Sequence, residues 1–327
     1  MSTAGDGPIP DTVQQTSSAL FFGFVIAAVL YGIVLLEGFR YFKSFRNDSI
    51  VTKALVALLC GLDTLHFGLS VHVAHHYLVR KFEDPNATVQ IIWSVKALGT
   101  TQVVLIWLVQ CLYLVRIWNS WLSSSSHREI LLHQKIAFLV LFSVVSIGMM
   151  GLGSGLVLII GFDRIQSFLD FNKIKWAVYL SFGIAATIDI AITTIMSILL
   201  YRGITGTRAT DGVLSTLICY FFSAGLSTSL AEVAYIILYA VADKSLLYMG
   251  VTFLISRIYT ISFLELLNVR KQLREDLDAT TSFQLGLSSM RFKTREMSST
   301  QDDGFSSGSQ PSSSIASATK SILEDIV

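Results

Sequence analysis

The chain has 327 residues, of which 52% are hydrophobic and only 14% are charged, and its formal net charge is +1. Soluble domains carry about 25% charged residues, so this composition argues against a soluble globular protein. The balanced charge gives no support for nucleic-acid binding. The apolar runs are continuous and do not alternate with period two, which argues against a membrane β-barrel.

Seven apolar stretches are each long enough to cross a hydrocarbon core, which takes about 20 helical residues. Their expected bounds are about 18–39, 52–78, 91–115, 134–160, 174–200, 213–241 and 246–268. The last two are joined by the very short connection ADKSL, so we expect them to be antiparallel neighbours. The predicted fold class is an all-α membrane protein, a bundle of seven transmembrane helices in the lipid bilayer.

The distribution of Lys and Arg predicts the orientation of the bundle. With the N terminus outside, the inner segments hold about twice as many of these residues as the outer ones, as the positive-inside rule requires. Residues 1–17 then form a short extracellular segment, and the Ser-rich residues 269–327 form a cytoplasmic tail, largely disordered and able to bind a cytoplasmic partner. A glycosylation sequon at Asn86 lies in a predicted outer loop, although a second sequon at Asn47 lies on the inner side.

The second stretch reads LDTLHFGLSVHVAHHYLV at residues 62–79 and holds four of the six histidines. Asp63 and His66 are three residues apart, so they share one face of a helix. An ionised carboxylate there must face the bundle or a wet cavity. The pair is either a polar contact that fixes helix packing, which we favour, or a proton- or ion-linked centre.

The remaining histidines of this stretch, His72, His75 and His76, lie toward its predicted outer end with the HxxHH spacing of membrane di-iron desaturases and hydroxylases. Those enzymes need further histidine boxes, and only His127 and His133 remain, on the opposite side of the predicted membrane. A single zinc site is geometrically poor, because adjacent helical residues point about 100° apart. We predict no metal, no cofactor and no catalytic residue, and expect interfacial imidazoles, with pH sensing as the alternative.

Charged and amide side chains recur in the later stretches. An unpaired charge inside a membrane costs several kcal/mol, so we expect these charges to be paired inside the bundle. The short connection before the seventh stretch favours Glu232 as the partner of Arg257, with Asp189 as the alternative. The candidates for a ligand site or polar core are Asp63, His66, Gln102, Asp189, Glu232 and Arg257.

The fourth stretch carries GMMGLGSG at residues 148–155, in which Gly151 and Gly155 form a GxxxG pair. Small residues at this spacing let two helices approach closely. We expect close packing inside the bundle, with a dimer face as the alternative.

A series of short motifs marks the last third of the apolar region: Asp189, Tyr201-Arg202, Thr210-Asp211, Gly225-Leu226-Ser227-Thr228-Ser229, Tyr259, Ser262 and Leu267-Asn268-Val269-Arg270. This pattern resembles the C-terminal half of a large family of fungal seven-span proteins, abundant in mushroom-forming fungi and labelled only as a domain of unknown function. LDTLH at 62–66 and HHYLV at 75–79 resemble the second span of that family, so the resemblance covers about residues 15–270. Ile261-Ser262-Phe263 replaces the usual Asn-Ser-Leu, and Glu265 is an added charge. The resemblance implies a seven-helix membrane fold and no established activity.

The sequence leaves three functions open for this multi-pass protein of the plasma membrane or an endomembrane. Seven spans, an outer N terminus and a Ser-rich inner tail favour a receptor-like or sensory protein that binds a small ligand. Carboxylates near the middle of the membrane suggest a proton- or ion-linked transporter as the alternative, although no inverted repeat is visible. A non-catalytic scaffold is the third. A seven-span zinc hydrolase is discounted, because the late stretches contain no histidine.

Overall fold

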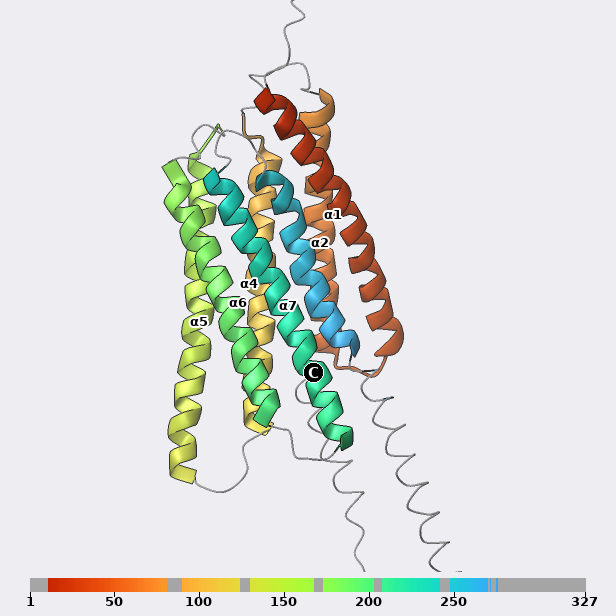
Figure 1. The fold of residues 1–327 in the computed structure, drawn as a ribbon, viewed down its shortest axis with the longest axis vertical. Coiled ribbons are helices and arrows are strands. Elements are labelled where there is room, and N and C mark those ends of the chain that lie inside the picture. Colours follow the sequence, from red (N-terminus) through yellow and green to blue (C-terminus); the bar gives the residue numbers. More distant parts are fainter. Residues whose placement is uncertain are drawn as a thin grey trace, which may run out of the picture.

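The structure is a computed structural model that describes residues 11–80, 90–123, 130–167, 173–202, 208–241, 248–269, 271 and 275. Its helices are α1 (Asp11–Ser44), α2 (Ile50–His75) with the π-helical turn η1 (His76–Arg80), α4 (Trp93–Ser123), α5 (Ile130–Arg164), α6 (Lys175–Arg202), α7 (Arg208–Val241) and a last helix, Tyr248–Val269. Successive helices run antiparallel in one bundle, in which the unlabelled last helix is drawn in teal to blue (Figure 1).

Seven helices in the described part of the chain contain a stretch long and apolar enough to cross a membrane, so the predicted all-helical class is confirmed. The helices extend beyond the apolar runs: α1 begins at Asp11 and α5 at Ile130. Hydropathy marks only the part of a helix that is apolar, whereas backbone hydrogen bonding continues into polar flanks. The N-terminal residues 1–10, the sequon at Asn86 and nearly all of the tail lie outside the described residues.

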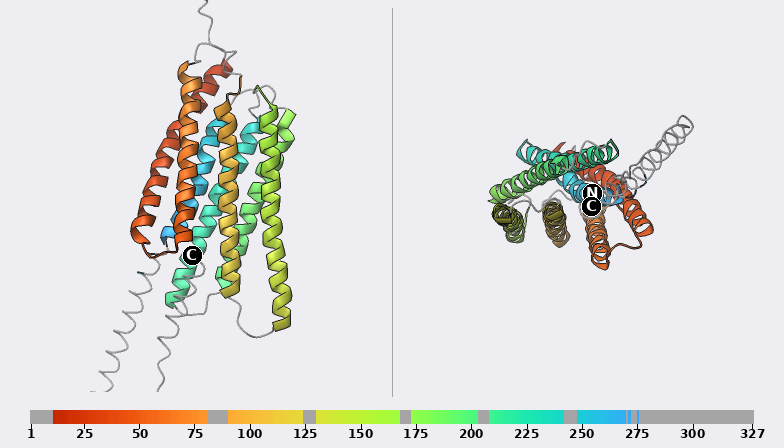
Figure 2. Two further views of the ribbon diagram at one scale, coloured as in Figure 1. Left: turned by 180° about the vertical axis from the view of Figure 1, so that it is seen from behind. Right: turned by 90° about the horizontal axis from the view of Figure 1, so that it is seen from below.

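The last helix is the most enclosed of the seven. Of its membrane-spanning stretch 72% is buried inside the bundle, against 17% for α5. Seen from below, it lies between the other helices (Figure 2). Its backbone touches α1 at a glycine pair, because a Cβ atom added to Gly23 would lie 2.5 Å from the Cα atom of Gly250. Small residues allow such close helix crossings.

Candidate functional site

Two polar clusters lie on opposite faces of the last helix. The first, called here the arginine cluster, joins Asp63 and His66 of α2 to Ser256 and Arg257, and all four residues are fully buried. Arg257 Nη1 lies 3.8 Å from Asp63 Oδ1 and donates a hydrogen bond to His66 Nδ1. The guanidinium carbon also lies 5.6 Å from the centre of the Phe67 ring. This cation–π contact adds to the ion pair in holding a buried charge.

The hydrogen bond from Arg257 decides the tautomer of His66. A guanidinium can only donate, so Nδ1 of His66 accepts and the ring proton of a neutral imidazole lies on Nε2. That Nε2 atom has no hydrogen-bond partner among the described residues. The same is true of each carboxylate oxygen of Asp63 and of the Nε and Nη2 atoms of Arg257. The cluster therefore balances charge well but satisfies few hydrogen bonds, and buried polar atoms of this kind are the usual partners of bound water.

The second cluster, called here the carboxyl–tyrosine cluster, draws on four helices. The hydroxyl of Tyr259 on the last helix lies 2.6 Å from Oδ2 of Asp189 on α6 and 2.6 Å from Oε1 of Glu232 on α7. Gln110 of α4 donates from Nε2 to Asp189 Oδ1 at 3.0 Å. All four side chains are buried, and Glu232 is fully so. The cluster ties α4, α6 and α7 to the last helix.

The geometry of the carboxyl–tyrosine cluster requires a shared proton. A phenol carries one proton, and each hydrogen bond needs a proton between its two oxygens. Because Tyr259 makes two contacts of 2.6 Å, one with Asp189 and one with Glu232, the second contact needs a proton on a carboxyl group. Among the described residues no ion pair joins either carboxyl to a basic side chain. This arrangement can hold and exchange a proton in the middle of the bundle.

The predicted pairing of Arg257 with Glu232 or Asp189 is therefore wrong, because Arg257 pairs with Asp63. Residues two apart on a helix point about 200° away from each other. Arg257 consequently faces α2, and Tyr259 faces α6 and α7. A short connection makes two helices neighbours but leaves open which face of each helix meets the other.

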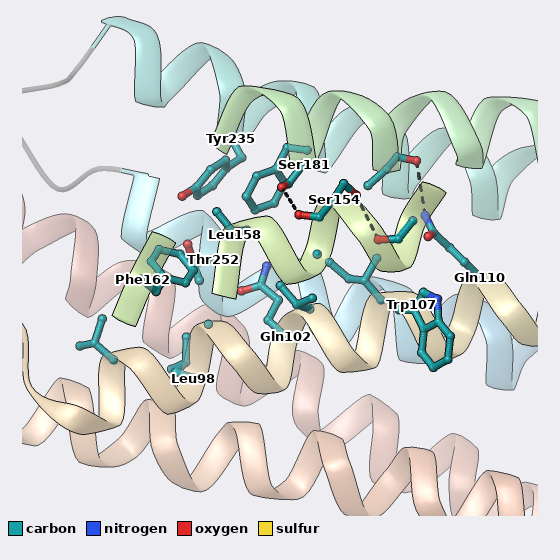
Figure 3. Close-up of a pocket in the computed structure, with 18 of the residues that line it drawn as sticks. Leu98, Gln102, Trp107, Gln110, Ser154, Leu158, Phe162, Ser181, Tyr235 and Thr252 are labelled. Atoms are coloured by element: carbon teal, nitrogen blue, oxygen red, sulfur yellow. Dashed lines mark hydrogen bonds between the residues drawn. The ribbon is translucent and has the colours of Figure 1, made fainter. Parts of the chain in front are cut away.

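A cavity of about 70 Å³ lies between α4, α5, α6, α7 and the last helix, with no charged residue in its lining (Figure 3). Most of its polar lining groups already donate hydrogen bonds within the protein. Ser181 Oγ donates to the backbone oxygen of Ser154 at 2.7 Å, and Ser154 Oγ donates to that of Gly151 at 3.0 Å. Gln102 differs: it is 3% exposed, and its Nε2 has no hydrogen-bond partner among the described residues.

Gln110 connects the cavity to the carboxyl–tyrosine cluster. Its side chain lines the cavity, and its Nε2 atom donates to the backbone oxygen of Ala185 at 3.4 Å (Figure 3). The same Nε2 atom donates to Asp189 Oδ1. A molecule in the cavity would thus touch a residue that holds one of the two buried carboxyls. The structure brings Gln102, Asp189 and Glu232 into one continuous region and places Asp63 and His66 on the other side of the last helix.

Residues 185–272 match the sequence profile of a "Family of unknown function (DUF6534)". The matched segment contains Asp189, Glu232, Arg257 and Tyr259, so it supplies part of both clusters. Neither the curated proteins nor the solved structures gave a match to the chain. Seven apolar helices and this match fit a multi-pass membrane protein of unknown activity.

The other histidines of α2 lie apart from both clusters, near the end of that helix. His72 Nδ1 and Ser94 Oγ are 2.9 Å apart, and the His72 ring lies 5.4 Å from Trp93. His75 is exposed, and the ring of His76 packs edge-on at 5.2 Å against Tyr77. Within the described ranges, no group of three or more His, Cys, Asp or Glu side chains is placed to hold a metal ion.

The glycines of α5 lie against the interior of the bundle. A Cβ atom added to Gly155 would lie 2.6 Å from Cγ1 of Val103 on α4. One added to Gly151 would lie 3.4 Å from Gln110 Oε1 and 3.4 Å from Ile188 Cδ1. These contacts place both glycines at helix crossings next to the cavity.

Sequence reasoning missed Tyr259 as a partner of the carboxyl groups. It appeared there only as one position of the family pattern, because a tyrosine in an apolar helix is an ordinary core residue. The signal that could have indicated it is its position two residues after Arg257, which puts its hydroxyl on the face opposite to the arginine.

Proposed function

We propose that this protein is a receptor-like membrane protein that binds a small molecule in the cavity between α4, α5, α6, α7 and the last helix. The observation that carries the proposal is a cavity with no charged residue in its lining, whose wall includes the buried Gln102, an amide with no hydrogen-bond partner for its Nε2 among the described residues. Ligand pockets are commonly apolar with a few polar groups that fix orientation.

The proposal includes the orientation and family that the sequence predicts. With the N terminus outside, the cavity lies in the outer half of the membrane, since Val95 and Gln102 come early in α4 and Met249 early in the last helix. The tail after residue 269 is then cytoplasmic and is the proposed contact for an intracellular partner. The resemblance to fungal seven-span proteins over about residues 15–270 supports the same fold.

A ligand signal has a physical route through the cluster contacts. A ligand that moves Gln110 changes the hydrogen bond to Asp189, and Asp189 shares Tyr259 with Glu232. A conformational change needs a ligand that contacts two states differently, and a ligand that touches Gln110 in only one of two states would meet this requirement.

The test is a ligand screen on the purified full chain in lipid nanodiscs, followed by thermal unfolding. We expect saturable stabilisation by one class of small molecule, with no transport of that molecule into proteoliposomes. The Ala185→Phe variant should fill the cavity and abolish the stabilisation, whereas the same change at the exposed Ala240 should leave it intact. A screen in which no compound stabilises the protein would reject the proposal.

A proton-linked transporter is the second candidate, and the shared proton of the carboxyl–tyrosine cluster supports it. In proteoliposomes such a protein would move solute in response to a pH gradient, and Asp189→Asn or Asp63→Asn would abolish that movement. If both variants change only the yield of folded protein, with neither flux nor ligand binding detected, the polar clusters only hold the helices together and the protein is a scaffold.

A further inference from the structure

A groove of about 430 Å³, called here the glutamate groove, lies between α1, α7 and the last helix. It shares no lining residue with the cavity of the proposed function. Its lining runs from Thr216 to Ser227 on α7 and from Ile258 to Glu265 on the last helix. These stretches are about 17 Å and about 10 Å long at 1.5 Å per residue, so a chain-like molecule can lie in the groove parallel to the helices.

The glutamate groove ends in a carboxylate that lacks a cation. Glu265 is the one charged residue among those that line the groove in the described part of the chain. It lies about 6 Å along the last helix from the end of that helix at Val269. Its side chain is exposed and has no ion pair or hydrogen bond with another described residue. Glu37, the other acid at this end, is instead held by Arg40 and Asn268.

Two hydroxyl groups of the lining are also free to bind. Those of Thr216 and Ser227 donate to backbone oxygens of α7 at 2.9 and 2.8 Å. The hydroxyls of Tyr220 and Ser223 make no hydrogen bond with a described residue. Inside a membrane such groups have little water to bind, so they favour a polar group on whatever fills the groove.

Packing places Tyr220 close to the level of Glu265 along the bundle. The ring of Tyr113 on α4 lies 6.2 Å from that of Phe221 and 5.6 Å from that of Phe263. Two residues that touch one ring lie at similar heights, and so do their near neighbours Tyr220 and Glu265. An alkylammonium group carries three N–H donors, so it can donate both to the carboxylate and to the phenol oxygen.

The charge of the groove selects among the molecules that a membrane offers. An anionic amphiphile would be repelled by Glu265, and a phosphate group would find no basic residue in the described lining. A peptide segment would bring backbone groups that cannot be satisfied in lipid. A plain hydrocarbon would fit Leu30, Ile258 and Ile261 but would leave the carboxylate unpaired. An amine on a single hydrocarbon chain pairs its charge near the membrane surface and lays its chain toward the middle of the membrane.

We infer that the glutamate groove binds a single-chain amphiphile with a protonated amine head, which donates hydrogen bonds to the carboxylate of Glu265 and to the hydroxyl of Tyr220. This is a second ligand site, and it does not depend on the proposed function because it lies outside the cavity.

The experiment measures equilibrium binding of tritiated dodecylamine to the full chain in phosphatidylcholine nanodiscs at pH 7, with empty nanodiscs as background. Dodecanol and dodecanoate serve as competitors of the same chain length. We expect saturable binding of the amine, competition by dodecanol that is about tenfold weaker, and no competition by dodecanoate. Competition by dodecanol or dodecanoate that equals competition by unlabelled dodecylamine would overturn the inference.

The matched variants for charge are Glu265→Gln and Glu275→Gln, since Glu275 is an exposed glutamate outside the groove. Glu265→Gln should lower dodecylamine affinity about tenfold and leave dodecanol affinity unchanged. Glu265→Asp, which keeps the charge, should retain most of the affinity, and Glu275→Gln should bind as the wild type does. Dodecylamine binding that is unchanged in Glu265→Gln would overturn the inference.

The matched variants for space are Ser223→Trp and Leu230→Trp, two exposed positions of α7 of which only Ser223 lines the groove. Ser223→Trp should abolish saturable binding of both dodecylamine and dodecanol, whereas Leu230→Trp should leave both intact. If Ser223→Trp instead converts a dimer to a monomer in the nanodisc, the groove is an interface between two copies and the inference fails.

The two ligand sites can be tested separately. Ala185→Phe, which fills the cavity, should leave dodecylamine binding intact, and Glu265→Gln should leave stabilisation by the cavity ligand intact. Loss of dodecylamine binding in Ala185→Phe would assign the amine to the cavity and overturn the inference. A ligand screen without any hit, together with dodecylamine binding that depends on Glu265, would reject the proposed function alone.

Discussion

The two clusters on the last helix handle buried polar groups in opposite ways. In the arginine cluster, Asp63 and Arg257 neutralise each other at 3.8 Å, and five of the atoms of Asp63, His66 and Arg257 have no hydrogen-bond partner among the described residues. In the carboxyl–tyrosine cluster no described cation is paired with the acids, and short hydrogen bonds to Tyr259 take its place. Acidic side chains buried inside the bundle can thus be stabilised by an opposite charge or by a shared proton. The two clusters should therefore respond differently to substitution.

Removing the cation should have the largest effect. Arg257→Met leaves Asp63 buried without its partner, and breaking a buried ion pair costs about 3–5 kcal/mol. Chemical unfolding in mixed micelles measures the free energy of unfolding. The double variant Asp63→Leu with Arg257→Met should recover most of the loss, because neither charge then remains. A single variant as stable as the wild type would show that the ion pair contributes nothing.

Conversion of acids to amides separates the two clusters. Asp63→Asn leaves the buried charge of Arg257 without a counter-ion, so we expect the free energy of unfolding to fall by about 3 kcal/mol. Glu232→Gln keeps an oxygen that accepts from Tyr259, so its loss should be about 1 kcal/mol or less. The same unfolding assay compares them. Equal losses from the two variants would mean that the clusters are held in the same way.

Loss of the shared hydroxyl tests the carboxyl–tyrosine cluster directly. Tyr259→Phe removes the donor between two buried carboxyls and should cost about 1–3 kcal/mol. The control is Tyr201→Phe, because Tyr201 is 70% exposed at the end of α6. Infrared spectroscopy should also show a changed carboxyl stretch in Tyr259→Phe alone. An unchanged carboxyl band would argue against a proton shared through Tyr259.

The smallest effect is expected at the link between the cavity and the cluster. Gln110→Leu removes one hydrogen bond to Asp189, while Asp189 keeps Tyr259, so the loss of unfolding free energy should be about 1 kcal/mol. Ligand binding in the cavity should persist in Gln110→Leu. Adding Asp189→Asn to Gln110→Leu should then leave the ligand affinity unchanged. Binding that still depends on Asp189 would place the link elsewhere.

Hydropathy was sufficient to predict the seven apolar helices, because it is a local property of about 20 residues. The cost of charge in lipid likewise indicated that Asp63, Asp189, Glu232 and Arg257 would lie inside, and all four are buried. Their partners could not be predicted in the same way. Pairing depends on the rotation of each helix and on which helices are neighbours in space, and these follow from packing over the whole bundle.

The cavity could be predicted from the local sequence even less than the pairing of the charged residues. Gln102 was a candidate from the sequence because it is a polar residue in an apolar stretch. Its lack of a partner depends on side chains from five helices, among them Ser181 and Tyr235, that are far apart along the chain. No local pattern around Gln102 contains that information.

The enclosed position of the last helix has a consequence for biogenesis. The ribosome releases this helix after the other six, yet it supplies Arg257 and Tyr259 to both clusters. Until the last helix is inserted, the partners Arg257 and Tyr259 are therefore missing for the acidic residues Asp63, Asp189 and Glu232. Chains that stop before Tyr248 lack both clusters, so they should remain with the insertion machinery or be degraded.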